Sequence, residues 1–138
     1  MDSPIKQVRL SKAAEEQLNK LKRSTKIKQW NILCRWALCR SLAEKSVPSP
    51  VPIQTDSSVT IAWDTFGGEI ADVLLIALKQ RCDRDKLDTD DATIRKQFTL
   101  HLHRGIGYLA GDTDLNEIED LVKIAIASMP RFAEIADR

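Results

Sequence analysis

Three prolines that alternate with other residues between positions 46 and 58 constrain the fold more than any other feature. Pro48, Pro50 and Pro52 lack a backbone donor and fix φ, so this segment can form neither a helix nor a central strand. Its Pro, Ser and Val content favours an extended path of the polyproline II type. The sequence therefore predicts a linking loop that separates two folded parts of the chain.

We expect one domain over residues 1–138, with a basic strand-helix-helix part at 1–45 and a strand plus helices at 59–138. The chain has 138 residues, enough to bury one core but cramped for two. Apolar residues make up 43% and charged residues 30%, as is usual for a globular protein. The chain carries no N-terminal apolar run and no apolar stretch long enough to span a bilayer, so we expect a cytoplasmic protein.

The first part predicts a strand followed by two helices. Apolar and basic residues alternate toward the end of segment 5–10, as in a half-exposed strand. Ser11 then offers an N-cap, and apolar residues recur at helical spacing to about Arg23. Ser24 or Thr25 is expected to cap the second helix. The stripe of that helix comprises Ile27, Trp30, Cys34, Ala37, Leu38 and Ser41, widened by Leu33 and Trp36.

The second part predicts a further strand and three helices. Segment 59–66 is β-prone and ends at a pair of glycines. Helical periodicity then covers about 69–83, 90–109 and 115–128. The expected fold class is thus mainly α, a compact domain of about five helices with one or two short strands. The core face of the helix at 69–83 is expected at Ile70, Val73, Leu74, Ala77 and Leu78.

Groups that could hold a metal or perform catalysis are sparse. Cys34, Cys39 and Cys82 lack the spacing of a zinc site, and we expect them to be buried small hydrophobic residues. His101 and His103 stand two residues apart on a predicted helix and so point to opposite sides, which indicates structural roles. No phosphate loop or nucleophile-base pattern is visible. The sequence predicts no enzyme activity, no metal and no cofactor.

The charges are distributed unevenly along the chain. Residues 1–45 contain eleven Lys or Arg and four acidic residues, a net charge of +7, whereas the remainder carries −6. Such asymmetry raises the local positive potential and points to a nucleic-acid or acidic partner. Five cations lie within residues 20–28, which suffices to engage several phosphates without reading bases.

The order strand, helix, short turn, helix resembles the ribbon-helix-helix arrangement, although the turn lacks the usual glycine. In that arrangement two chains form a β-ribbon that enters the major groove, and the start of the second helix holds phosphate. Lys6, Gln7 and Arg9 would lie on the ribbon, and Lys26 and Lys28 would contact phosphate. The predicted DNA-binding residues are Lys6, Arg9, Lys12, Lys20, Lys22, Arg23, Lys26 and Lys28.

Two segments carry a resemblance that extends over essentially the whole chain: Trp-Asp-Thr-Phe-Gly-Gly-Glu at 63–69 and Arg-Gly-Ile-Gly-Tyr-Leu at 104–109. With them the chain resembles the small E component of the Dnd-type DNA sulfur-modification (phosphorothioation) system. The resemblance implies a mainly helical, oligomeric DNA-binding accessory, expected to be a homotetramer. Other subunits of the system would supply the cysteine desulfurase and iron-sulfur chemistry.

Three hypotheses about function remain open at this point. The first is an accessory that binds double-stranded DNA and prefers nicked duplex, because sulfur insertion into the backbone is easier at an opened strand. The second is a ribbon-helix-helix-like transcriptional regulator, which would protect a defined palindrome. The third is a protein-protein assembly adaptor whose basic face docks acidic partners.

Overall fold

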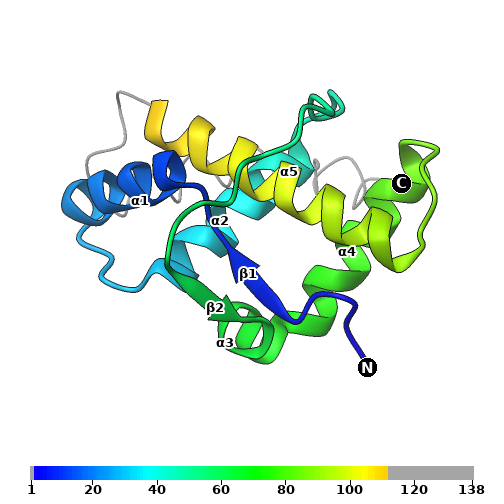
Figure 1. Cartoon of the computed structure of the whole chain (residues 1–138), viewed down its shortest axis with the longest axis horizontal. Helices are drawn as coiled ribbons and strands as arrows, with labels where there is room; N and C mark the ends of the chain where they lie inside the picture. The colour runs from blue at the N-terminus through cyan, green and yellow to red at the C-terminus, as the bar shows by residue number, and fades with distance from the viewer. Residues whose placement is uncertain (1, 112–138) are drawn as a thin grey trace, which may run out of the picture.

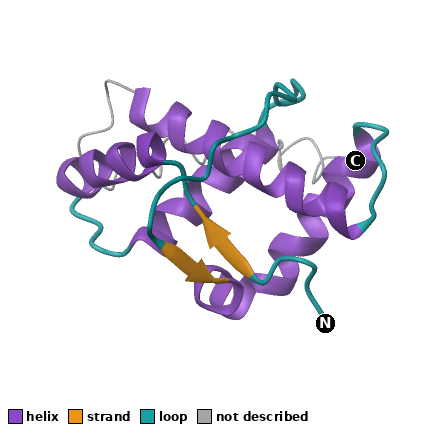
Figure 2. Cartoon of the chain, viewed as in Figure 1, coloured by secondary structure: helices purple, strands orange, loops and turns teal. Residues whose placement is uncertain are grey.

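The computed structural model of the chain describes residues 2–111, so the helix predicted at 115–128 lies outside the described residues. The described part is mainly helical with one small antiparallel sheet, which confirms the expected fold class (Figures 1 and 2). The elements are β1 Gln7–Arg9, α1 Lys12–Thr25, α2 Trp30–Ala43, β2 Thr60–Ala62, α3 Trp63–Gly67, the 3-10 turn η1 Gly68–Ile70, α4 Ala71–Arg84 and α5 Asp91–Gly111.

The boundary between α1 and α2 differs from the prediction. Ser11 caps α1 as expected, because its side chain accepts a hydrogen bond from the N–H of Ala14 at 3.0 Å. Thr25, however, is the last residue of α1, and its hydroxyl donates to the carbonyl of Leu21 at 2.7 Å. It therefore does not cap α2. Lys26 takes the left-handed conformation that ends α1, and Gln29 precedes α2 without a side-chain cap.

The centre of the fold is the crossing of α2 and α5, which make the most extensive contact between any two elements (Figure 1). A Cβ at Gly105 of α5 would lie only 1.7 Å from the carbonyl oxygen of Ala37 in α2. The two helix backbones therefore approach closely at this point, and only glycine fits there. Buried leucine and isoleucine side chains, including Leu38 and Ile106, fill the core on either side.

The segment 63–67 is a short helix, α3, where the sequence predicted the end of a strand. Trp63 and Phe66 lie three residues apart on α3, so their rings share one side and stack with centroids 5.5 Å apart. Both rings pack edge-on against Phe98 of α5, at 5.5 and 5.3 Å. This aromatic cluster overrides the β propensity of the individual residues. The predicted strand is thereby reduced to β2, Thr60–Ala62.

The core face predicted for the helix at 69–83, which corresponds to η1 and α4, is wrong at two positions. Ile70 is 43% exposed and Val73 62% exposed. The segment carries two apolar stripes at helical spacing, and the sequence alone does not say which one faces inward. The buried face comprises Ala71, Leu74, Leu75, Leu78, Arg81 and Cys82.

The end of α2 is fixed by a buried arginine of α4. Arg81 is 5% exposed and donates to the carbonyls of Leu42, Glu44, Lys45 and Ser46 at 2.6 to 3.3 Å. Its Nε also pairs with Asp85 at 2.9 Å. Leu42 lies in the last turn of α2, whose carbonyls have no intrahelical partners, and the other three carbonyls belong to the residues just after the helix. They also set the direction in which the Pro-rich loop leaves α2.

The cysteines follow the expected pattern only in part. Cys34 and Cys82 are buried, as predicted. Cys39 is exposed, because it lies five residues beyond Cys34 on the opposite side of α2. Burial raises the pKa of Cys34 to about 12, so this thiol stays protonated at neutral pH.

Candidate nucleic-acid interface

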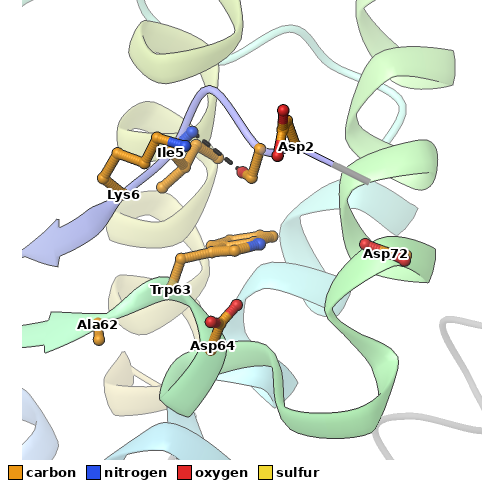
Figure 3. Close-up of a pocket in the computed structure, with 8 residues that line it drawn as sticks. Asp2, Ile5, Lys6, Ala62, Trp63, Asp64 and Asp72 are labelled. Carbon is orange, nitrogen blue, oxygen red and sulfur yellow. Dashed lines mark hydrogen bonds between the residues drawn. The ribbon is translucent and has the colours of Figure 1, made fainter.

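The outward face of β1 is formed by Gln7 and Arg9. Both side chains are exposed, and Val8 between them is buried, so the period of two sends them to the same side. Lys6 is exposed as well, but it precedes the strand and lines a pocket beside Trp63 (Figure 3). The structure therefore brings Gln7 and Arg9 together and does not place Lys6 with them.

The ribbon that contains these residues forms within one chain. β1 pairs antiparallel with β2, and Val8 stands opposite Ile61. In the ribbon-helix-helix arrangement the second strand comes from another chain instead. The partner strand here is supplied after the Pro-rich loop, whose Ser57 N–H donates to the carbonyl of Leu10 at 3.0 Å.

The cations of α1 do not all point in one direction. Lys20 reaches the end of α5, where its Nζ lies 3.5 Å from the carbonyl oxygen of Ala110. Lys22 turns to the start of α2, and its Nζ lies 5.5 Å from the centroid of the Trp30 ring. The predicted run of five cations is thus divided between two sides of the helix.

Four cations lie in the last turn of α1 and in the loop before α2, and we name them the junction cations: Lys22, Arg23, Lys26 and Lys28. Arg23, Lys26 and Lys28 are exposed, and Lys22 is half-buried over Trp30. In Figure 1 the loop that carries Lys26 and Lys28 lies at the opposite end of the view from the N-terminus.

The start of α2 itself favours an anion. Gln29 provides no side-chain cap, and no acidic residue occurs in the first turn. The first N–H groups of a helix have no intrahelical acceptor, and the helix dipole adds a partial positive charge there. The expected phosphate contact therefore has a physical basis at Trp30 and Asn31, although Lys26 and Lys28 belong to the preceding loop and not to α2.

Lys12 is separate from the junction cations. It begins α1, and its backbone N–H donates to the carboxylate of Asp56 at 2.9 Å. This hydrogen bond, with a smaller contribution from the lysine charge, lowers the pKa of Asp56. Asp56 thus stays ionised at neutral pH, and its negative charge beside Lys12 opposes the approach of a phosphate.

Several arginines that the sequence pattern does not single out lie on α2 and α5. Arg35 donates to the carbonyl of Phe66 at 2.6 Å. Arg40 and Arg104 lie over the Tyr108 ring, at 4.7 and 5.7 Å from its centroid. Arg104 also donates to the carbonyls of α2 and the loop after it. These contacts are structural, so the arginines join α2 to α3 and α5 and are not added to the candidate interface.

Both histidines have structural contacts on opposite sides of α5. His101 shares a 2.8 Å hydrogen bond with Ser41 of α2, and burial, with the nearby arginine charges, lowers its pKa to about 4. His103 accepts from the N–H of Ser11 at 3.0 Å, while its other ring nitrogen lies 2.8 Å from the carbonyl of Thr99. The predicted structural role thus agrees with the contacts.

The fold and this site define a small, mainly helical protein in which a run of cations precedes an uncapped helix start. Residues 7–117 match the family "DNA sulphur modification protein DndE", and the chain belongs to the DndE family. Its family membership links it to DNA phosphorothioation, as the resemblance implied.

Solved structures agree with this assignment. The crystal structure of DndE from Escherichia coli B7A, involved in DNA phosphorothioation modification, is 28% identical with a TM-score of 0.63, over 75% of this chain and 95% of that one. A DndE mutant involved in DNA phosphorothioation is 24% identical with a TM-score of 0.59, over 75% and 97%, and shows the shared fold. Among curated proteins no match was found.

Proposed function

We propose that this chain is the DNA-binding accessory subunit of a DNA phosphorothioation machinery and holds the DNA backbone at the junction cations. The observation that carries the proposal is that these cations immediately precede the uncapped start of α2, with Lys22 over the ring of Trp30. Cationic side chains and free helix N–H groups together favour phosphate. The proposal places the chain in the cytoplasm. None of the described helices is both long enough and apolar enough to cross a membrane.

In this proposal the subunit performs no chemistry of its own and works with the other subunits of the sulfur-modification system. The buried Arg81 uses its donors on carbonyls of the chain itself, and Nδ1 of the buried His101 is hydrogen-bonded to Ser41. A transcriptional regulator is less well supported, because β1 pairs within its own chain and leaves no argument for a two-chain ribbon.

The finer points of the proposal concern assembly and the form of the DNA. A homotetramer would present the junction cations four times and so raise the avidity for one duplex. A nick frees a backbone end and lets the duplex bend, which would bring more phosphates against four such surfaces. The proposal therefore includes a preference for nicked over intact double-stranded DNA.

Gel-shift assays with intact, nicked and single-stranded DNA at two salt concentrations test both points. Lys26→Glu/Lys28→Glu should weaken binding to duplex at least tenfold, and the matched reversal Lys79→Glu/Lys96→Glu on α4 and α5 should not. Equal effects of the two double variants would refute the interface. Equal affinity for nicked and intact duplex would refute the nick preference and leave DNA binding intact.

A further inference from the structure

A pocket of about 240 Å³ lies at the far end of β1 from α1, between the N-terminal segment, the β2–α3 connection and α4 (Figure 3). The volume corresponds to about eight water molecules at roughly 30 Å³ each. It is smaller than the roughly 300 Å³ at which sites for drug-sized ligands begin. The pocket is therefore of the size for one long side chain. Its lining residues are Asp2, Ser3, Ile5, Lys6, Ala62, Trp63, Asp64 and Asp72.

The rim of this pocket is negatively charged. Asp2, Asp64 and Asp72 come from three separate segments, and against them stands the single cation Lys6. The ion pairs found within residues 2–111 involve none of the three carboxylates. No group of three or more potential ligands in that part of the chain is placed to hold a metal ion. The excess of negative charge in the lining thus favours a cation, and the lack of a metal-ligand group among the described residues points to an organic one.

Trp63 gives the pocket a rigid aromatic wall. The side chain is 5% exposed, held between Phe66 and Phe98, and no hydrogen bond from its indole N–H to a described residue is found. Figure 3 shows the indole between Asp2 and Asp64, with the ring nitrogen on the side of Asp72. A fixed indole beside carboxylates matches a guanidinium, which stacks on an aromatic face and donates to carboxylates in its own plane.

The surface beside the pocket is apolar. Asp72 and Ile76 are neighbours on α4 by their spacing of four residues, and Ile76 is 44% exposed. Val73, next to Asp72, is 62% exposed. Exposed β-branched residues beside a charged pocket are typical of a protein interface and not of a site for a small free cation.

We propose that this pocket receives an arginine side chain of a partner protein, with the Val73 and Ile76 side of α4 packed against the apolar residues around that arginine. The partner belongs among the other subunits of the sulfur-modification system, a choice that rests on the proposed function. The docking site lies apart from the junction cations, so its loss leaves DNA binding intact.

The pocket can be tested directly by NMR on the full chain. N-acetyl-arginine amide should shift the indole N–H signal of Trp63, identified with Trp30→Phe and Trp36→Phe variants, at millimolar concentrations. N-acetyl-citrulline amide, which has the same shape without the charge, should not. Asp64→Asn/Asp72→Asn should weaken the arginine titration at least tenfold, and the matched control Asp88→Asn/Asp91→Asn should leave it unchanged. Equal shifts with the two amides, or no shift of the Trp63 signal, would refute arginine binding in this pocket.

The partner is tested with the purified other subunits of the system. Asp64→Asn/Asp72→Asn should lower the affinity for one of them at least tenfold, while the gel shift with duplex DNA stays as in the wild type. Thermal unfolding checks that both double variants are folded. If the wild type binds none of the other subunits, the proposed docking is refuted. It is also refuted if Asp64→Asn/Asp72→Asn changes only the oligomeric state of this protein in the absence of partners. If the wild type does not bind duplex DNA, the proposed function is refuted, independently of the docking site.

Discussion

Two glycines of one helix provide a sharp test of how the fold is held together. Gly105 and Gly107 both lie within α5, and replacement by alanine inside a helix ordinarily stabilises it by about 1 kcal/mol. A Cβ at Gly107 would meet nothing within 4 Å, so Gly107→Ala should realise this gain. At Gly105 the new methyl group would lie 1.7 Å from the carbonyl oxygen of Ala37, about half the 3.4 Å of ordinary contact.

The magnitude follows from which atom must move. The obstacle at Gly105 is backbone in the middle of α2, so no side-chain rotation relieves it and the α2–α5 crossing has to open. Overpacking of a core costs about 1–3 kcal/mol, and the upper value applies to a rigid neighbour. With the gain in helix propensity subtracted, Gly105→Ala should destabilise the fold by about 2 kcal/mol. The two variants should therefore differ by about 3 kcal/mol.

Urea and thermal unfolding at one fixed protein concentration measure this difference. For a chain of this size, about 3 kcal/mol corresponds to melting temperatures roughly 10 °C apart. The concentration must be the same because assembly would shift both transitions. If the free energies of unfolding of Gly105→Ala and Gly107→Ala differ by less than 1 kcal/mol, the backbones of α2 and α5 do not approach as closely as described here.

Three further predictions follow from other contacts. Because the pKa of His101 is lowered to about 4 in the folded chain, the unfolded state binds the proton first. Stability should therefore fall by up to about 3 kcal/mol between pH 6.5 and 4, and His101→Gln should remove most of that slope in urea titrations. Arg81→Met leaves four carbonyls and Asp85 without their donor and should cost about 3–5 kcal/mol of unfolding free energy. A loss below 1 kcal/mol would contradict the role of Arg81 in fixing the end of α2. Lys26→Gln/Lys28→Gln should reduce the salt slope of duplex binding by about 1.8 in a plot of log affinity against log salt, and an unchanged slope would exclude both phosphate contacts.

The elements that could be predicted from the sequence are those whose signals are local. The Ser11 cap and the stripe of α1 depend on spacing within a few residues, and they agree with the structure. The stripe of α2 agrees from Leu33 to Ser41, whereas Ile27 lies before the helix. The segment 63–67 was predicted wrongly because its helical form depends on Phe98, more than thirty residues away in the chain. The exposure of Val73 likewise depends on which of two apolar stripes meets α5, a choice made by tertiary packing.

The candidate site shows the same division between what is near in sequence and what is near in space. The five cations at 20–28 suggested one surface, yet the helical period carries Lys20 toward α5 and Lys22 toward α2. Lys6 does not lie with the other predicted DNA-binding residues, because the pairing of β1 with β2 places it beside Trp63 and the carboxylates of the pocket.

The separation of the predicted cations in space limits how steeply the affinity for DNA can fall with salt concentration. If all eight predicted cations neutralised phosphates, the slope for a duplex would approach about −7 per chain, at roughly 0.9 for each contact. The four junction cations, which share one end of the fold, support about −3.6. A measured slope near the larger value would mean that Lys6, Arg9, Lys12 and Lys20 also reach DNA. Since Lys6 lines the pocket beside Trp63 and Lys20 reaches the end of α5, such a slope would favour DNA that is contacted by several copies of the chain.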